Sequence, residues 1–443
     1  MHFDEAVDYL LSLGHETLAI KLGLANIEHL LAALGHPPRA YPCVQIAGTN
    51  GKGSTAAMLE SICRAAGVRA GLYTSPHLVS ITERISIQGQ DISREDFARH
   101  TAQVRAVSLE LQKTMGARPT FFEQVTAIAL LAFRASQVRL AILETGLGGR
   151  LDATTAARSE IVAITPVAYD HQEYLGHTLR EIAAEKAAII RTDTAAVVVA
   201  RQPDETREVI LSRCRERHLT PRFATNDQLV LGADEAGRLR VTFNTAQDIY
   251  EDVRLSLPGR HQADNAATAL ALAEVLRERG FALTRAAIIE GLETTRHPGR
   301  LEWQAGTPPL LFDGAHNAAG ARALRDYLDE FIHVPVTMIF GAMQDKDLQE
   351  IATTLFPAVH KLILTRPTNP RAAAPGTLQQ LVSPEISGKL CALIAATSPA
   401  EAIGVAHEIT LPGGIICVTG SLYLVGEVQS LMARRGGHLN RDA

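Results

Sequence analysis

Short apolar runs alternate with longer segments of helical spacing in the first half of the chain. The runs lie at 44–47, 140–143, 161–165 and 196–199. The segments 121–133 and 179–190 repeat apolar residues every three to four positions, which is typical of buried helices. This order predicts a parallel sheet flanked by helices.

The pattern changes between residues 222 and 257. Short alternating runs such as 239–243 are separated there by Asn and Gly turns, which predicts a small β subdomain at the margin of the first domain. Helical spacing returns at 262–278 and 285–293, and the segment 295–299 is typical of a linker.

Beyond this linker the alternation starts again. Strands are predicted at 310–312, 336–340, 361–365 and 415–419, each followed by a helical segment. The fold class is therefore α/β, with a first domain over residues 1–297 and a second, Rossmann-like domain over residues 298–443. Ligands of such pairs tend to bind in the cleft between the domains.

The composition is that of an ordinary soluble protein, with 46% hydrophobic residues, 21% charged residues and a net charge of −5. Aromatic residues make up 5%, and no basic stripe is interleaved with them, so nucleic acid is not expected as a partner. The acidic N-terminus lacks the order of a signal peptide, and no apolar run is long enough to span a membrane. We expect a cytoplasmic protein without membrane association. Its five scattered cysteines predict reduced, mostly buried thiols without a disulfide framework or structural zinc.

A glycine-rich heptapeptide follows the first apolar run and precedes a helical stretch at 55–66. Glycines let backbone N–H groups approach phosphate oxygens, a lysine neutralises their charge, and the helix directs its positive end to the same point. Only two residues separate the first glycine from the Gly-Lys pair, so the spacing departs from G-x-x-x-x-G-K-[ST]. A plain glycine-rich turn is the alternative, but the strand, lysine and helix favour a nucleotide site formed by Gly48, Thr49, Asn50, Gly51, Lys52, Gly53 and Ser54.

Polar side chains follow several other predicted strands, where ligands bind in open α/β sheets. Glu144 could hold Mg²⁺, which prefers oxygen ligands, or it could be a helix-capping or ion-paired carboxylate. Ser75 could be a further ligand or part of an ordinary Ser-Pro turn. His171 could share this site or be structural. Asp313 follows the first strand of the second domain and could face the phosphate loop across the cleft.

Taken together, these segments resemble the folylpolyglutamate synthase and dihydrofolate synthase family of the Mur ligase group. The resemblance covers almost the whole chain, and its motifs occur in one order: GTNGKGS at 48, TSPHL at 74, TFFE at 120, ETGLGGRLDAT at 144, DH at 170, EKA at 185, LPGRHQ at 257, GRLE at 299, DGAHN at 313, DKD at 345 and TGSLYLVGE at 419. The first domain would then be a P-loop ATPase-like domain of the Mur ligase central type.

The resemblance implies an ATP-dependent ligase that joins L-glutamate to folate or dihydropteroate through an acyl phosphate. Asn265, Arg300 and Asp313 would complete the ATP site begun by the phosphate loop. Two Mg²⁺ ions would be bound by Ser75, Glu144, His171 and a carbamylated Lys186, although Lys186 could instead be a plain lysine paired with Glu185. Lys52, Lys186 and His316 are the residues expected to act in catalysis.

The family pattern also implies an acceptor site. Its segments are Thr120, Phe121, Phe122 and Glu123, then Leu151, Asp152 and Ala153, with 21–24 as a further lining. Ser421 and His316 would lie near the incoming glutamate. One departure is Thr155, since the family usually has D-A-T-N, where this chain has Asp152-Ala153-Thr154-Thr155.

Three other interpretations stay open at this point: a monofunctional folylpolyglutamate synthase, another Mur-type amino-acid ligase, and a non-catalytic nucleotide-binding module. The lack of an additional nucleotide-sugar domain before Gly48 argues against the second. The glutamate, histidine and lysine of the predicted metal site argue against the third. A monomer is expected, because no extended apolar surface motif is evident.

Overall fold

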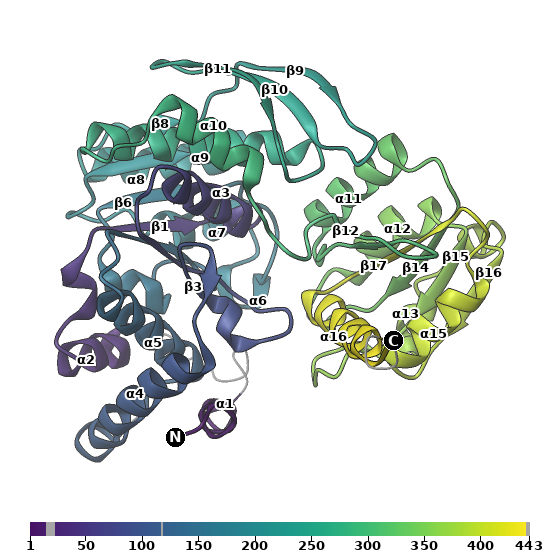
Figure 1. The fold of residues 1–443 in the computed structure, drawn as a ribbon, viewed down its shortest axis with the longest axis horizontal. Coiled ribbons are helices and arrows are strands. Elements are labelled where there is room, and N and C mark those ends of the chain that lie inside the picture. Colours follow the sequence, from purple (N-terminus) through teal and green to yellow (C-terminus); the bar gives the residue numbers. More distant parts are fainter. Residues whose placement is uncertain (15–22, 117, 440–443) are drawn as a thin grey trace.

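The computed structural model describes residues 1–14, 23–116 and 118–439. Two lobes, each built on its own sheet, lie side by side (Figure 1). Within the described ranges, no helix combines the length and the apolar character needed to cross a membrane.

The first lobe contains an eight-stranded sheet in the order β4-β3-β2-β5-β1-β6-β7-β8. The six neighbouring strands β2, β5, β1, β6, β7 and β8 are parallel to one another. Strands β3 and β4 pair antiparallel at the edge of the sheet beside β2. The central strands are buried on both faces, which is why they are continuous apolar runs. The strands are β1 Cys43–Ala47, β2 Ala70–Tyr73, β3 Ile85–Ile87, β4 Gln90–Asp91, β5 Leu140–Glu144, β6 Ile161–Ile164, β7 Ala196–Val199 and β8 Arg222–Phe223.

Helices cover both faces of this sheet. One face packs against α3 Lys52–Ala65, α9 His261–Glu278 and α10 Arg285–Thr294. The other face packs against α1 Phe3–Leu11, α2 Ala25–Ala33, α4 Arg94–Met115, α5 Phe121–Ala135, α7 Leu179–Ala187 and α8 Asp204–Glu216. Short helical turns complete the lobe: η1 Pro37–Ala40, η2 Ile81–Arg84, η3 Ala153–Ala157 and α6 Gln172–Leu175.

The predicted β subdomain is a separate antiparallel sheet in the order β11-β10-β9. Its strands are β9 Gln228–Ala233, β10 Leu239–Asn244 and β11 Ile249–Arg254. Figure 1 shows this sheet extending from the first lobe toward α11 of the second. The Tyr327 hydroxyl donates a 2.8 Å hydrogen bond to the Ala236 carbonyl at the β9–β10 turn, so the small sheet connects the two lobes.

The second lobe contains a six-stranded sheet in the order β12-β13-β17-β14-β15-β16, in which only β12 is antiparallel. Its strands are β12 Glu302–Gln304, β13 Leu310–Phe312, β14 Val336–Phe340, β15 Lys361–Leu364, β16 Ala392–Ala395 and β17 Ile415–Thr419. The predicted strands correspond to β13, β14, β15 and β17, and the two edge strands were not expected.

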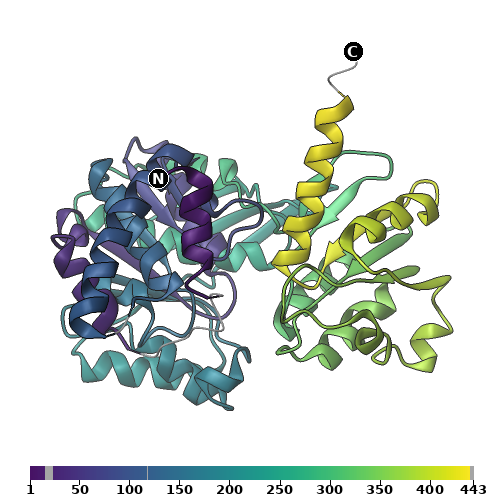
Figure 2. The same cartoon turned by 90° about the horizontal axis from the view of Figure 1, so that it is seen from below.

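The helices of the second lobe lie on both faces of its sheet. They are α11 Ala318–Phe331, α12 Leu348–Leu355, η4 Phe356–Ala358, α13 Pro375–Gln379, α14 Pro384–Ser387, α15 Pro399–Ile409 and α16 Leu422–Leu439. Figure 2 shows α16 on the side that faces the first lobe. A Cβ placed on Gly426 of α16 would lie 1.9 Å from the Leu78 carbonyl oxygen, so the lobes are in close contact there.

All five cysteines are free, as expected. Four thiols are buried, and Cys391 is exposed.

Candidate active site

The glycine-rich loop joins β1 to α3 and is held tightly by its neighbours. The N–H groups of Thr49 and Asn50 both donate to the Pro166 carbonyl after β6, at 2.9 and 3.2 Å. Gly51 caps α3 with a φ of +81°, and a Cβ there would lie 2.2 Å from Oδ1 of Asn265. The N–H groups at the start of α3 have no partners within the helix, so they are donors for an anion.

Three ionisable side chains, those of Glu144, Lys52 and Lys186, lie close to this loop. Glu144 ends β5 with a buried carboxylate, whose Oε2 accepts a 3.2 Å hydrogen bond from Ser75 N–H. Burial raises the pKa of Glu144, and the nearby Lys52 opposes this rise. Burial lowers the pKa of Lys52, whose Nζ donates to the Thr49 carbonyl at 3.1 Å.

Lys186 on α7 is 4% exposed, and its Nζ donates to the Gly48 carbonyl at 2.9 Å. Burial, together with the charge of Lys52, lowers the pKa of Lys186 to about 7. A substantial fraction of this amine is therefore neutral at neutral pH. The predicted pairing with Glu185 is not formed, because Glu185 pairs with Arg150 at 2.8 Å.

A buried carboxylate in the loop between β6 and α6 contacts groups of both lobes. Asp170 accepts hydrogen bonds from Lys346 Nζ at 2.5 Å and from Asn317 Nδ2 at 3.1 Å, both from the second lobe. His316 Nε2 lies 3.7 Å from the same carboxylate. Although burial alone would raise the pKa of Asp170, the charges of His171, Lys346 and His316 hold it well below its usual range. Burial lowers the pKa of His171 to about 3.

The loop after β13 carries the remaining groups of the second lobe. Asp313 accepts from the N–H groups of Leu301 and Ala315 at 3.0 and 2.9 Å. Burial raises the pKa of Asp313, and Arg300 opposes the rise. Asn317 Nδ2 donates to Oδ1 of Asn50 in the phosphate loop at 3.0 Å, so the two lobes meet directly at this loop.

Two adjoining cavities lie between the lobes. The first has a volume of about 330 Å³, and all residues predicted for ATP and metal line it: Gly48, Thr49, Asn50, Gly51, Lys52, Gly53, Ser54, Ser75, Glu144, His171, Lys186, Asn265, Arg300 and Asp313. The second has a volume of about 230 Å³. Both contain Ser75, residues 146–148, His171 and His316, so the cavities share a wall.

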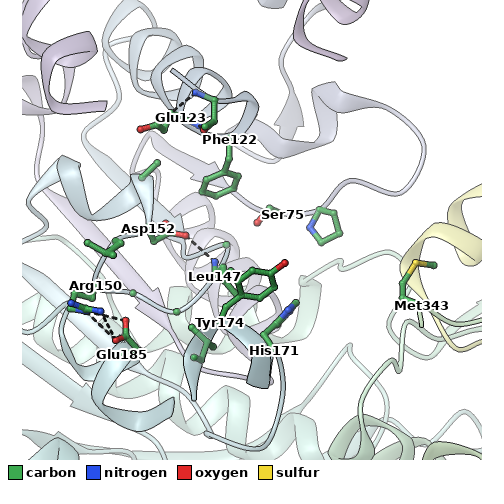
Figure 3. A pocket seen from close by; sticks show the side chains of 18 of the residues that line it. Ser75, Phe122, Glu123, Leu147, Arg150, Asp152, His171, Tyr174, Glu185 and Met343 are labelled. Carbon is green, nitrogen blue, oxygen red and sulfur yellow. Dashed lines mark hydrogen bonds and ion pairs between the residues drawn. The ribbon is translucent and has the colours of Figure 1, made fainter. Parts of the chain in front are cut away.

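The second cavity contains most of the predicted acceptor residues, namely Thr120, Phe122, Glu123, Leu151, Asp152, Ala153 and Ser421. Figure 3 shows Phe122, Leu147, Tyr174 and His171 around this cavity, with Met343 contributed by the second lobe. Phe121 is not part of the lining and instead packs in the core, with the Arg84 guanidinium 5.4 Å from its ring centroid. Gly23 also lines the cavity, whereas positions 21 and 22 of the predicted segment lie outside the described residues.

Several of these residues have clear structural contacts. Thr120 and Glu123 form the capping box of α5, with Thr120 N–H donating to Oε2 of Glu123 at 2.7 Å. The carboxylate of Asp152 accepts from Leu147 N–H at 2.9 Å and from the Thr154 hydroxyl at 2.5 Å. It therefore fixes the shape of the loop that lines the cavity.

Thr155 replaces a side-chain amide with a hydroxyl that has two partners. It donates to the Gly149 carbonyl at 2.7 Å and accepts from Gln45 Nε2 at 2.8 Å. Sequence reasoning gave no role to Gln45, Asp170, Asn317 or Lys346. Three of these residues lie in the motifs DH at 170, DGAHN at 313 and DKD at 345, which were the available signal for them, whereas Gln45 lies in no such motif.

The residues predicted to bind metal differ in how well they fit a cation. Among the residues that the structure describes, no three His, Cys, Asp or Glu side chains gather in a metal-binding arrangement. Glu144 nevertheless fits a cation, because its carboxylate is buried and has few donors. Lys186 would join as an oxygen ligand only after modification of its amine.

Residues 46–273 match the Mur ligase middle domain, and residues 299–422 match the Mur ligase, glutamate ligase domain. Fold and cavities thus define a Mur-type ligase.

The chain is 34% identical to the dihydrofolate synthase/folylpolyglutamate synthase of Bacillus subtilis, over 94% of this chain and 96% of that protein. It belongs to the dihydrofolate synthase/folylpolyglutamate synthase family.

Two solved structures extend the similarity. The folylpolyglutamate synthase of Mycobacterium tuberculosis complexed with ADP has a TM-score of 0.89 and 31% identity, covering 97% of this chain and 98% of that one. A bifunctional folylpolyglutamate synthase/dihydrofolate synthase with Mn, AMPPNP and L-glutamate bound has a TM-score of 0.83 and 29% identity, covering 98% of each chain.

Proposed function

We propose that this protein is an ATP-dependent amide-forming ligase that adds L-glutamate to tetrahydrofolate and to 7,8-dihydropteroate. The observation that carries the proposal is the pair of cavities with a shared wall, one lined by a phosphate loop and the other by a mainly apolar surface that also carries charged side chains. A nucleotide phosphate and an acceptor carboxylate could meet at that wall. The names of the relatives support both activities.

In this proposal the first cavity binds ATP. The N–H groups at the start of α3 and the ammonium of Lys52 hold the β- and γ-phosphates. Asn265 and Arg300 contact the nucleoside, and Asp313 orders the loop that contacts it from the second lobe. The relatives with bound ADP and AMPPNP support this assignment.

Glu144, Ser75 and His171 would hold divalent cations, with a carbamylated Lys186 as a further oxygen ligand for a second Mg²⁺. A carbamate forms when a neutral amine attacks CO₂, and the lowered pKa of Lys186 supplies that amine. Bound Mg²⁺ would neutralise charge on the transferring phosphoryl group.

The reaction would proceed in two steps. A carboxylate is a poor electrophile, so the acceptor carboxylate first attacks the γ-phosphate, which yields an acyl phosphate and ADP. The amine of glutamate then displaces phosphate and forms the amide. Lys52 stabilises the developing charge, and Phe122 and Leu151 exclude water from the acyl phosphate. His316 and Ser421, on loops of the second lobe, would position glutamate.

The contacts of Asp170 with Lys346 and Asn317 support a closed arrangement of the lobes during these steps. The two family matches, ending at 273 and beginning at 299, support a domain division at 297/298. A monomeric state and a cytoplasmic location remain predictions from the sequence.

Mass spectrometry of the reaction products tests this proposal. Purified protein is incubated with ATP, Mg²⁺ and L-glutamate, and with either tetrahydrofolate or dihydropteroate. We expect both acceptors to gain glutamyl residues. Gain on tetrahydrofolate alone would restrict the protein to polyglutamylation, and gain on neither would favour another Mur-type ligase or a nucleotide-binding module.

A further inference from the structure

Gln45 lies at the middle of β1, three residues before the phosphate loop, and its side chain is fully buried. Its amide nitrogen lies 3.3 Å from the Thr145 hydroxyl, 2.9 Å from that of Thr154 and 2.8 Å from that of Thr155. An amide nitrogen has two hydrogens, so the three hydroxyls share them. One side chain thus contacts both ends of the segment 145–155.

The hydroxyls of Thr154 and Thr155 also hydrogen-bond to the loop that lies between Thr145 and Thr154. The Thr154 hydroxyl donates to the Asp152 carboxylate, which in turn accepts from Leu147 N–H at 2.9 Å. The Thr155 hydroxyl donates to the Gly149 carbonyl at 2.7 Å. The loop from 146 to 153 is therefore anchored to β1 through a continuous series of hydrogen bonds.

This loop forms much of the acceptor cavity. Residues 146–153 line that cavity, and residues 146–148 also line the nucleotide cavity. Gln45 itself reaches neither cavity. Its effect on a bound acceptor must therefore act through the loop.

The burial of Gln45 is unfavourable by itself. Within the described part of the chain, its Oε1 is buried and has no hydrogen-bond partner. A buried unsatisfied carbonyl destabilises a fold, and an apolar side chain would avoid this penalty. The role of this amide therefore lies in what its nitrogen contacts.

We propose that Gln45 is a positioning residue, which sets the acceptor loop against the phosphate loop through the hydroxyls of Thr145, Thr154 and Thr155. Because β1 continues directly into the phosphate loop, one strand then fixes the positions of both reacting groups. The proposal rests on the proposed ligase function for its kinetic consequence. Its structural consequence, a loop held by Gln45, does not depend on that function.

The test uses Gln45→Met, which keeps the side-chain length and removes the donor. The hydroxyls of Thr154 and Thr155 retain their own acceptors in this variant. We expect the KM for the folate acceptor to rise about tenfold, as for the loss of one or two buried hydrogen bonds, and the KM for ATP to change less than about twofold. Thr155→Val should shift the acceptor KM in the same direction. The double variant should lose less than the sum of the two single effects, because both single variants remove the contact between Gln45 and Thr155.

Hydrogen exchange measured on the same variants supplies a readout without turnover. Amides of 146–155 should exchange faster in Gln45→Met, while those of the phosphate loop should not. The matched control is Thr337→Val, which removes a buried hydroxyl that accepts from Thr410 in the second lobe. It should change neither the KM ratio nor the exchange of 146–155.

Unchanged exchange at 146–155, or an equal rise of both KM values, would overturn the role of Gln45. If the wild-type protein showed no ligation with either acceptor, the proposed function would fail. The exchange result would still decide whether Gln45 holds the loop.

Discussion

Replacing Lys186 with methionine should stabilise the protein at neutral pH while abolishing the proposed ligase activity. The Lys186 side chain is buried, and its pKa falls from an ordinary value of 10.5 to about 7. In the unfolded chain the same amine is protonated up to about pH 10.5. Folding therefore requires either loss of that proton or burial of the charge.

The size of this effect follows from the pKa values. Between about pH 7 and pH 10.5 the unfolded state binds more protons, so stability rises with pH. Below pH 7 the penalty is fully present, and it amounts to about 4 kcal/mol at pH 7. The hydrogen bond from Lys186 to the Gly48 carbonyl offsets about 1 kcal/mol of it. Methionine, which carries no charge, should therefore gain about 3 kcal/mol at pH 7 and about 1 kcal/mol at pH 9.

Urea denaturation in CO₂-free buffer at pH 7 and pH 9 measures this difference, provided that the slopes agree between proteins. The matched control is Lys361→Met, whose ammonium also donates to a backbone carbonyl, that of Ile409, but lies in the second lobe. A stability difference that is the same at both pH values, or a Lys186→Met variant less stable than wild type at pH 7, would show that the buried amine does not destabilise the fold.

Three further predictions concern the cleft. Glu144→Gln keeps the shape of the side chain but removes the anion, so ADP release should fall by about a thousandfold or more; near-normal turnover would contradict the metal assignment. Asp170→Asn leaves the buried Lys346 ammonium without its carboxylate, which should lower kcat/KM for glutamate by about a hundredfold, as for a broken buried ion pair. Gly51→Ala would place a Cβ 2.2 Å from Oδ1 of Asn265 at a left-handed backbone position, so the KM for ATP should rise at least about tenfold.

Controls for two of these variants come from the same chain. Asp252→Asn removes a carboxylate from an exposed pair with Arg240 and should leave kcat/KM unchanged. Gly67→Ala introduces the same left-handed strain, at φ +71°, but has no atom within 4 Å of the new Cβ. If Gly67→Ala raised the KM for ATP as much as Gly51→Ala, contact with Asn265 would not be the cause.

The sequence predicted the parallel core of both lobes well because buried parallel strands are continuous apolar runs. The strand expected at 44–47 is β1 at Cys43–Ala47, and that expected at 140–143 is β5 at Leu140–Glu144. Strands β12 and β16 were missed because they are short edge strands with partly exposed side chains, which weakens the apolar signal.

Site residues at strand ends could be predicted, but their cross-lobe partners could not. Asp170 lies 176 residues from Lys346 and 147 from Asn317, and no local pattern encodes such a pairing. The motif TFFE at 120 also does not indicate which of its two adjacent phenylalanines faces a cavity. In α5, Phe122 lines the acceptor cavity, while Phe121 is in the core.

In the proposed function, ATP cleavage serves the ligation of glutamate to a pterin acceptor. ADP release measured with ATP and Mg²⁺, with glutamate and each acceptor omitted in turn, tests it most directly. We expect multiple-turnover ADP release only when glutamate is present together with either tetrahydrofolate or dihydropteroate. ADP release at the same rate without any acceptor, or none with the complete mixture, would contradict it.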